Sequence, residues 1–537
     1  MIKLNRSQRL FLALSSGILL FSGWSFTYEF LMFLGFVPLL IVEHYYSNFY
    51  RLHSKLSIFL NFYLSFFTWN AFSVWWIYYA TFIGAILAIS INSLFMTIVF
   101  FIYHLFKRKN NFYLSLLFFI IIWLSFEYIH FNWELSWPWL TLGNGLANLH
   151  QIIQWYEYTG VLGGSLWILI SNVLIFSMII NWYEKDYTPR LQIYSFILLI
   201  LIPTLFSIIK YLNYKPIGNK SKALIIQPNI DPYEEKFDTN TINYQMTIFK
   251  NLIINGIDNE TKYIILPETA LPIPIWEDLL LYYNEIQEFI KISKKYNVSI
   301  ITGASTYKKY NYKATKTARL SSTGFFYDAF NSALLIYKDS IQIYHKSVLV
   351  LGVEKMPFSN YLKFLEPLAL DLGGTSGSLG IHDTPFVFIN KIKFTPAICY
   401  ESVYGEYLSK SILKNGQCII VITNDGWWNN SPGYKQHLMM SKLRAIEFRK
   451  DILRSANTGI SAYINQKGDI VLKTNWWTQE YLSTEFFYNN KITFYTLFGD
   501  YIGKISCIIL IIIFLSLLLK KIKHKIFTSS KNSNIQI

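Results

Sequence analysis

Long runs of apolar residues dominate the first 212 positions of the chain and return once near its end. A helix needs about 20 residues to cross the hydrocarbon core of a bilayer. Eight runs come close to this length or exceed it, and the second is the shortest. We therefore expect eight transmembrane helices, at about residues 10–26, 29–44, 57–78, 81–106, 112–130, 160–182, 191–212 and 500–519.

The basic residues predict how these helices are oriented. Lys and Arg occupy the N-terminal tail, the loops after the second, fourth and sixth predicted helices, and the tail after the eighth. The alternate short loops, including residues 131–159, contain neither. By the positive-inside rule, both termini are cytoplasmic and residues 213–498 lie on the opposite side. We expect a membrane domain at 1–212, an external domain at 213–498, and a last helix with a basic tail at 499–537.

The external segment has a different pattern, in which short β-branched runs alternate with polar, helix-like stretches such as Asp278–Lys295 and His437–Arg449. Strands of four to eight residues between helices predict an α/β domain. About 285 residues are ample for one hydrophobic core. The predicted strands include Ala223–Gln227, Tyr263–Leu266, Val298–Thr302, Leu334–Tyr337 and Ile419–Thr423.

Composition and charge agree with a membrane protein. Hydrophobic residues make up 53% of the chain and charged residues 15%, whereas soluble domains carry about 25% charged residues. The net charge of +15 would suggest nucleic acid, but the placement of the basic residues follows membrane topology instead, so we expect no nucleic-acid partner. Three cysteines cannot form a disulfide framework, so each is considered by itself.

Three candidate chemical groups follow strand-like segments of the external domain: Glu268, Lys346 and Cys399. Taken singly, each is more often a solvated acid, a surface lysine or an inert core cysteine. At the ends of successive strands they can assemble at one edge of a sheet. The thiol is then the nucleophile, the carboxylate moves its proton, and the ammonium lowers the thiol pKa and faces the oxyanion.

The motifs Pro267-Glu268, Tyr344-His345-Lys346 and Cys399-Tyr400-Glu401 resemble the Glu-Lys-Cys signature of the nitrilase superfamily. With the predicted membrane helices, the chain from about residue 10 to 519 resembles the apolipoprotein N-acyltransferase family in its Bacteroidetes-like form. One departure is Phe237, where many members have tryptophan, so apolar bulk is retained and the indole donor is lost. Further motifs that narrow the match are Trp137–Leu140, Asn424–Trp428, Gln436–Leu438, Arg444–Glu447 and Leu453–Gly459.

This resemblance implies an αββα sandwich and a two-step acyl transfer. Cys399 would attack a phospholipid ester and form a thioester, from which the α-amine of a diacylglyceryl-cysteine at a lipoprotein N-terminus would take the acyl chain. Glu268 would be the general base and Lys346 the oxyanion stabiliser. The family pattern further implies a monomer in a bacterial inner membrane, with its catalytic domain in the periplasm and no metal or cofactor. It assigns supporting or substrate-binding roles to Glu354, Tyr400, Glu401 and Trp427.

The residues themselves also favour a lipid substrate. Trp133, Trp137 and Trp139 cluster in an external loop, as interfacial anchors do, and a soluble amidase has no need of eight membrane helices. Two alternatives stay open. One is a membrane-tethered nitrilase-type amidohydrolase in which water resolves the thioester, since the Glu-Lys-Cys triad is common to both. The other is a non-enzymatic scaffold or transporter, but the predicted helices carry few ionisable residues, of which Glu127 is the main one, and no proton relay is visible.

Overall fold

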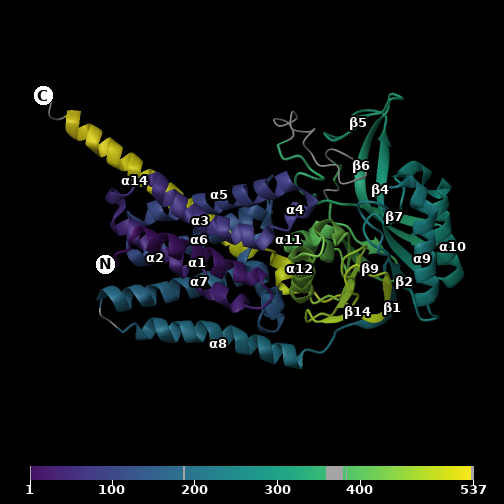
Figure 1. The fold of residues 1–537 in the computed structure, drawn as a ribbon, viewed down its shortest axis with the longest axis horizontal. Coiled ribbons are helices and arrows are strands. Elements are labelled where there is room, and N and C mark those ends of the chain that lie inside the picture. The colour runs from purple at the N-terminus through teal and green to yellow at the C-terminus, as the bar shows by residue number, and fades with distance from the viewer. Residues whose placement is uncertain (1, 186–187, 359–378, 382–383, 534–537) are drawn as a thin grey trace.

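The computed structural model describes residues 2–185, 188–358, 379–381 and 384–533 of the chain. Long helices lie side by side at one end of the molecule, and two β-sheets with their helices lie at the other (Figure 1). Helix α1 begins, and helix α14 ends, at the end of the bundle away from the sheets (Figure 1). We call helices α1–α8 and α14 the membrane bundle: α1 Arg6–Phe21, α2 Val37–Asn48, α3 Lys55–Val74, α4 Ile77–Ala80, α5 Phe82–Lys107, α6 Phe112–Phe131, α7 Tyr156–Lys185, α8 Arg190–Asn213 and α14 Tyr501–Ser533.

Polar side chains set the starts of four of these helices. Asn5, Ser54, Thr81 and Asn111 each accept a hydrogen bond from a backbone N–H in the first turn of α1, α3, α5 and α6. These N–H groups have no partner within the helix, so a side-chain oxygen at this position stabilises the helix where it begins.

Six helices of the described chain are long and apolar enough to cross a membrane: Glu29–Asn48, Phe82–Lys107, Phe112–Phe131, Tyr156–Glu184, Arg190–Asn213 and Tyr501–Lys523. The first combines a 3₁₀ turn, Glu29–Leu34, with α2. The other two predicted spans coincide with α1 and α3. Helix α1 has only 16 residues, and α3 contains polar residues such as Asn70, which accepts a hydrogen bond from Asn92 at 2.8 Å inside the bundle. The membrane bundle is confirmed, and the count of eight spans stays a prediction.

The α/β domain contains two sheets. The first has strand order β14-β1-β2-β4-β6-β5, with β3 beside β4 and β7 beside β6, and the second has order β13-β12-β11-β10-β9-β8. All five predicted strands are confirmed. The strands are β1 Asn219–Gln227, β2 Tyr263–Ile265, β3 Ile275–Trp276, β4 Ser299–Tyr310, β5 Arg319–Leu320, β6 Phe326–Tyr337, β7 Ser340–His345, β8 Phe388–Ile389, β9 Lys393–Ile398, β10 Cys418–Thr423, β11 Ile452–Ala456, β12 Ala462–Ile464, β13 Ile470–Lys473 and β14 Glu480–Tyr488.

Helices cover the outer face of each sheet, which confirms the four-layer αββα arrangement. Along β1, Leu224 and Ile226 pack against α9 and α10, whereas Ala223 and Ile225 face the second sheet. Strand β10 alternates in the same way between the sheets and helices α11 and α12. Strands buried on both faces read as continuous apolar runs. The helices of this domain are α9 Ile242–Gly256, α10 Asn284–Tyr296, α11 Gly405–Ile412, α12 Pro432–Phe448 and α13 Phe494–Phe498.

Arg449, at the end of α12, connects the α/β domain to α7 of the bundle. Its side chain is fully buried, and its Nε donates to the carboxylate of Glu157, which also pairs with Lys210. One Nη donates to the side chain of Gln154 at 2.7 Å and the other to its backbone carbonyl at 2.8 Å. Removing one partner of a buried ion pair leaves the other charge uncompensated, so this contact is costly to break.

We expect Arg449→Met to lower the free energy of unfolding by about 3–5 kcal/mol. The measurement is thermal unfolding of the detergent-solubilised protein. Lys220→Met is the matched control, because Lys220 pairs with Glu485 in an exposed ion pair, which contributes about 0–1 kcal/mol. Equal melting temperatures for the two variants would contradict the proposed role of Arg449.

Candidate active site

The three predicted chemical residues all follow strands and meet at one site. Glu268 comes shortly after β2, Lys346 directly after β7 and Cys399 directly after β9. Lys346 Nζ lies 3.3 Å from Glu268 Oε1, and the charges of both residues act on the Cys399 thiol. The expectation of a single sheet edge was wrong in one respect. Glu268 and Lys346 belong to the first sheet and Cys399 to the second, so the site lies where the two sheets face each other.

Hydrogen bonds on both carboxylate oxygens orient Glu268. Oε1 accepts from the side-chain amide of Asn331 at 2.7 Å, and Oε2 accepts from the backbone N–H of Asn424 at 3.0 Å. Its backbone carbonyl accepts from the buried ammonium of Lys236 at 3.0 Å. A carboxylate held in this way has little freedom to rotate, which suits a group that must receive a proton from one direction.

Lys346 is a buried ammonium between two carboxylates. Its side chain is 1% exposed, and its Nζ lies 2.9 Å from Glu354 Oε1 as well as near Glu268. Burial alone would lower the pKa of Lys346, but the charges of Glu354 and Glu268 outweigh burial and raise it above its usual range. Asn331 donates to the same Glu354 oxygen at 3.0 Å. The lysine therefore stays protonated and can stabilise a negative charge.

Cys399 is half-buried and has a left-handed backbone conformation with φ of +52°. Burial, followed by the charge of Glu268, raises the pKa of its thiol well above the usual range, although Lys346 acts in the opposite direction. The expected lowering of the thiol pKa by an ammonium is therefore outweighed. The resting thiol keeps its proton, so it depends on a nearby base to become a nucleophile.

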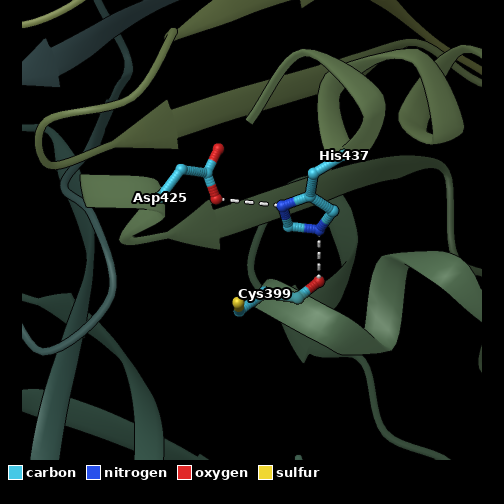
Figure 2. A group of neighbouring side chains, drawn as sticks. All are labelled: Cys399, Asp425 and His437. Atoms are coloured by element: carbon cyan, nitrogen blue, oxygen red, sulfur yellow. Dashed lines mark hydrogen bonds and ion pairs between the residues drawn. The ribbon is translucent and has the colours of Figure 1, made fainter. Parts of the chain in front are cut away.

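Hydrogen bonds hold the backbone on both sides of the thiol. The Cys399 carbonyl accepts from Ser402 Oγ at 2.8 Å and from His437 Nε2 at 3.1 Å. The preceding N–H, of Ile398, donates to Glu401 Oε2 at 2.7 Å. Figure 2 shows the imidazole between the Asp425 carboxylate and this carbonyl oxygen.

Cys399, Asp425 and His437 also offer ligand atoms within 4.8 Å of one another, a spacing that could hold a metal ion. The surrounding contacts favour a hydrogen-bonded group instead. Arg454 donates to Asp425 Oδ2 at 2.5 Å and supplies a positive charge where a cation would have to bind. Both ring nitrogens of His437 already have hydrogen-bond partners.

Glu401 connects the nucleophile to the segment that follows the lysine. Its Oε1 accepts from Tyr344 Oη at 2.7 Å and from the backbone N–H of Ser347 at 2.6 Å, while Oε2 accepts from Ile398. Burial raises the pKa of Glu401 to about 7. The contacts of this carboxylate are internal, so they give it a structural part in fixing the relative positions of Cys399 and Lys346.

The tryptophans of the external loop lie against the α/β domain. Trp139 is 1% exposed, and Trp137 stacks on both Trp139 and Tyr400, with ring centroids 5.6 and 6.0 Å apart. The expectation of a membrane-interface anchor was therefore wrong for the buried Trp139, whereas for Trp133 and Trp137, which are half-buried, it stays a prediction. A tryptophan in a loop has the same apolar character whether lipid or protein covers it. Glu127 is likewise structural, because it accepts from the backbone N–H of Leu142 at 2.9 Å.

Trp427 belongs to a small aromatic group that it forms with Tyr233 and Phe237. Its ring is stacked near Phe237, with centroids 6.4 Å apart and an interplanar angle of 16°. Tyr233 packs edge-on against Trp427 and donates to its backbone carbonyl at 2.9 Å. Phe237 thus makes an aromatic contact with Trp427.

A cavity of about 940 Å³ adjoins the lysine side of the site. Ser347, which directly follows Lys346, lines it together with Trp133 of the external loop and Tyr404. Its volume is at the upper end of the range for small-molecule sites, about 300–1,000 Å³.

Three residues of the site were not singled out for a role in catalysis from the sequence. Asn331 is a lone amide in the apolar strand β6, which is a detectable signal. Lys236 resembles any surface lysine, and only the structure reveals its burial, which lowers its pKa to about 8. His437 was noted only as part of the Gln436–Leu438 motif and of a helix-like stretch, and its position in the sequence does not indicate its contact with Cys399.

Comparison with known proteins agrees with this geometry. The family model described as the apolipoprotein N-acyltransferase N-terminal domain matches residues 16–174, and the carbon-nitrogen hydrolase model matches residues 225–487. A protein of Chlorobaculum tepidum named apolipoprotein N-acyltransferase is 29% identical over 513 residues, which cover 92% of this chain and 93% of that protein. A protein of the same name from Wigglesworthia glossinidia brevipalpis is 29% identical, with 76% of each chain covered.

Among solved structures, Saccharomyces cerevisiae Nit3, described as a member of branch 10 of the nitrilase superfamily, is 15% identical, with a TM-score of 0.36. The similarity covers 51% of this chain and 92% of that one. The family assignment depends on the sequence matches. One family model covers part of the membrane bundle, and the second covers most of the α/β domain that follows it in the chain. Because both parts match, the chain belongs to the apolipoprotein N-acyltransferase family.

Proposed function

We propose that this protein transfers an acyl chain from a phospholipid to the N-terminal amine of a diacylglyceryl lipoprotein, through a thioester on Cys399. One observation carries the proposal: a buried Glu-Lys pair acts on a cysteine thiol in a domain that is fixed to a bundle of apolar helices. A lipid ester and a lipoprotein amine both reach such a site from the membrane surface. The named relatives support the same assignment.

In the first half-reaction, the Cys399 sulfur forms a bond to the ester carbonyl carbon while its proton passes to Glu268. Lys346 donates to the oxyanion that develops on the carbonyl oxygen. The carbon–oxygen bond of the ester then breaks, and Glu268 returns the proton to the departing lysophospholipid oxygen. The products are a lysophospholipid and an acyl thioester on the enzyme.

In the second half-reaction, the lipoprotein amine attacks the thioester carbonyl. Glu268 accepts a proton from the amine, the carbon–sulfur bond breaks, and the thiol is restored with that proton. Glu354 keeps Lys346 in position for both steps. Glu401 and Tyr400 maintain the surroundings of the nucleophile, and Trp427 lies on the path of the lipid chains.

The orientation is part of the proposal: both termini are cytoplasmic, and the α/β domain is on the periplasmic side of a bacterial inner membrane. The excess of Lys and Arg in the loops on one side of the bundle supports this topology. We also propose that the protein acts as a monomer, because one chain supplies Glu268, Lys346 and Cys399.

Incubation with phospholipid is expected to add one acyl mass to the wild-type protein and none to Cys399→Ala, because only the thiol can form the thioester. Intact-mass spectrometry of the detergent-purified protein measures the adduct, and hydroxylamine should remove it. A diacylated lipopeptide should then discharge the adduct and gain one acyl chain. Discharge by water at the same rate, with no gain of peptide mass, would identify a hydrolase instead.

Glu268→Gln is expected to slow formation of the adduct by about 10²–10⁴-fold, the usual contribution of a general base. The amide keeps the size of the side chain but cannot accept the thiol proton. The matched control is Glu260→Gln, which changes an exposed acid paired with Lys222 and should acylate at the wild-type rate. A wild-type rate for Glu268→Gln would remove this residue from the mechanism.

Alkylation of Cys399 by iodoacetamide should be slow at neutral pH and should keep accelerating above pH of about 8.5, the ordinary pKa of cysteine. The rate is expected to rise with pH because the pKa of the Cys399 thiol is raised and only the thiolate reacts. Peptide mapping after timed alkylation separates Cys399 from Cys418 and Cys507. A rate that levels off below this pH would show that the thiol is already ionised in the resting site.

A further inference from the structure

We propose that Gln436 and His437, adjacent residues of α12, transmit the docking of the membrane bundle to the nucleophile, with His437 as a positioning residue that holds Cys399 in its reactive conformation. This inference rests on the proposed function, because it treats Cys399 as the residue that is acylated. It assigns His437 no proton transfer to substrate.

The first step of the argument is the contact between His437 and Cys399. His437 is fully buried, and its Nε2 lies 3.1 Å from the carbonyl oxygen of Cys399 and 2.9 Å from Ser402 Oγ. A carbonyl oxygen only accepts, and the Ser402 hydroxyl already donates its proton to that carbonyl at 2.8 Å, so Nε2 is the donor toward both oxygens. The bond reaches the backbone and not the sulfur (Figure 2), so His437 acts through the conformation of Cys399.

That conformation needs support. Cys399 has a φ of +52°, in the left-handed region that side chains with a β-carbon rarely adopt. The hydrogen bonds from His437 and Ser402 fix its carbonyl, and together with the N–H of Ile398 bonded to Glu401 they determine where the thiol points. Strained backbone at a reactive residue persists when its neighbours restrain it in this way.

His437 is itself held from behind. Its Nδ1 lies 2.9 Å from Asp425 Oδ1, and Asp425 also accepts from Thr423 Oγ1 at 2.7 Å and from Arg454 at 2.5 Å. Attraction to Arg454 and His437 outweighs burial and lowers the pKa of Asp425 below its usual range. The imidazole therefore has a fixed anionic partner that determines the plane and direction of the ring.

The second step is the contact of Gln436 with the bundle. Its Oε1 accepts from the indole N–H groups of Trp139 at 2.8 Å and Trp76 at 3.1 Å. Its Nε2 donates to the backbone carbonyl of Ser73, at the end of α3, at 3.0 Å. All four residues are buried. One amide thus joins α3 and the external loop to α12, immediately before the histidine that holds the nucleophile.

The test compares single-turnover acylation by phospholipid, followed by intact mass over a range of lipid concentrations, for four variants. His437→Leu removes the donor and should lower the maximal rate about 30–100-fold, as misplacement of a reacting group does. The lipid concentration for half-maximal rate should stay unchanged, and alkylation of Cys399 by iodoacetamide should slow as well. His437→Gln keeps an N–H donor and should restore the rate to within about tenfold of wild type.

Gln436→Met removes the hydrogen bonds to both tryptophans and should lower the maximal acylation rate about three- to tenfold. This loss would measure how much the contact of α12 with the bundle contributes to the position of Cys399. His44→Leu is the control for a buried histidine that pairs with Glu184 in the bundle, away from Cys399. It should lower the melting temperature without changing the rate. A His437→Leu protein that acylates as fast as wild type, or one that differs only in its lipid dependence, would overturn the positioning role.

If His437→Leu does not fold, His437→Gln and Gln436→Met still decide the question. A wild-type rate in Gln436→Met would show that the contact of Gln436 with the bundle does not affect Cys399. A rate at or below a hundredth of the wild-type rate in His437→Gln would show that an N–H donor at this position is not sufficient to hold Cys399. Failure of the proposed function itself looks different, because the wild-type protein would then form no adduct with any phospholipid tested.

Discussion

The attachment of α12 to the membrane bundle is the constraint on which the rest of the site depends. Along this one helix, Gln436 accepts from the indoles of Trp76 and Trp139 and donates to the end of α3. Glu447 accepts from the backbone N–H of Val161 at 3.1 Å, and Arg449 follows with its ion pair to Glu157. Val161 follows Gly160, whose φ of +61° interrupts the regular helical backbone of α7, so that the Val161 N–H can bond to a side chain from outside the helix. At this break in α7, the backbone N–H of Val161 is therefore satisfied by Glu447, a side chain of the α/β domain. Hydrogen bonds thus join the two parts of the protein.

Burial and neighbouring charges together determine the protonation states of Lys346 and Cys399, and with them the reactivity of the site. Within the described residues, Lys346 keeps its proton because two carboxylates surround it, and the thiol keeps its proton because it is buried near one of them. An ionised thiol in the resting enzyme would be open to oxidation and alkylation at all times. A protonated thiol beside a fixed carboxylate becomes nucleophilic only as the ester carbonyl arrives, when Lys346 can stabilise the charge that forms.

Much of the fold was accessible from the sequence, because apolar runs and β-branched runs carry strong local signals. The strands ending near Glu268, Lys346 and Cys399 were predicted, and so was the helix that contains His437. What the sequence did not reveal depends on pairings between distant segments. Cys399 follows a strand of a different sheet from the other two residues, and no local pattern encodes which sheet a buried strand joins. For the same reason Trp139 of the external loop was assigned to the membrane interface, although protein covers it.

An acyl-enzyme that serves two bulky lipid substrates in turn must keep water away from the thioester while the first product leaves and the second substrate arrives. The described site is fixed on the backbone side, since the Cys399 carbonyl accepts from His437 and the N–H of the preceding Ile398 donates to Glu401. Cys399 as a whole residue is half-buried. The exchange of substrates therefore has to occur on the side of Cys399 away from α12, while the side facing α12 stays fixed. A rigid attachment to the bundle serves the same requirement, because the acyl carbonyl must keep its position relative to Lys346 through both half-reactions.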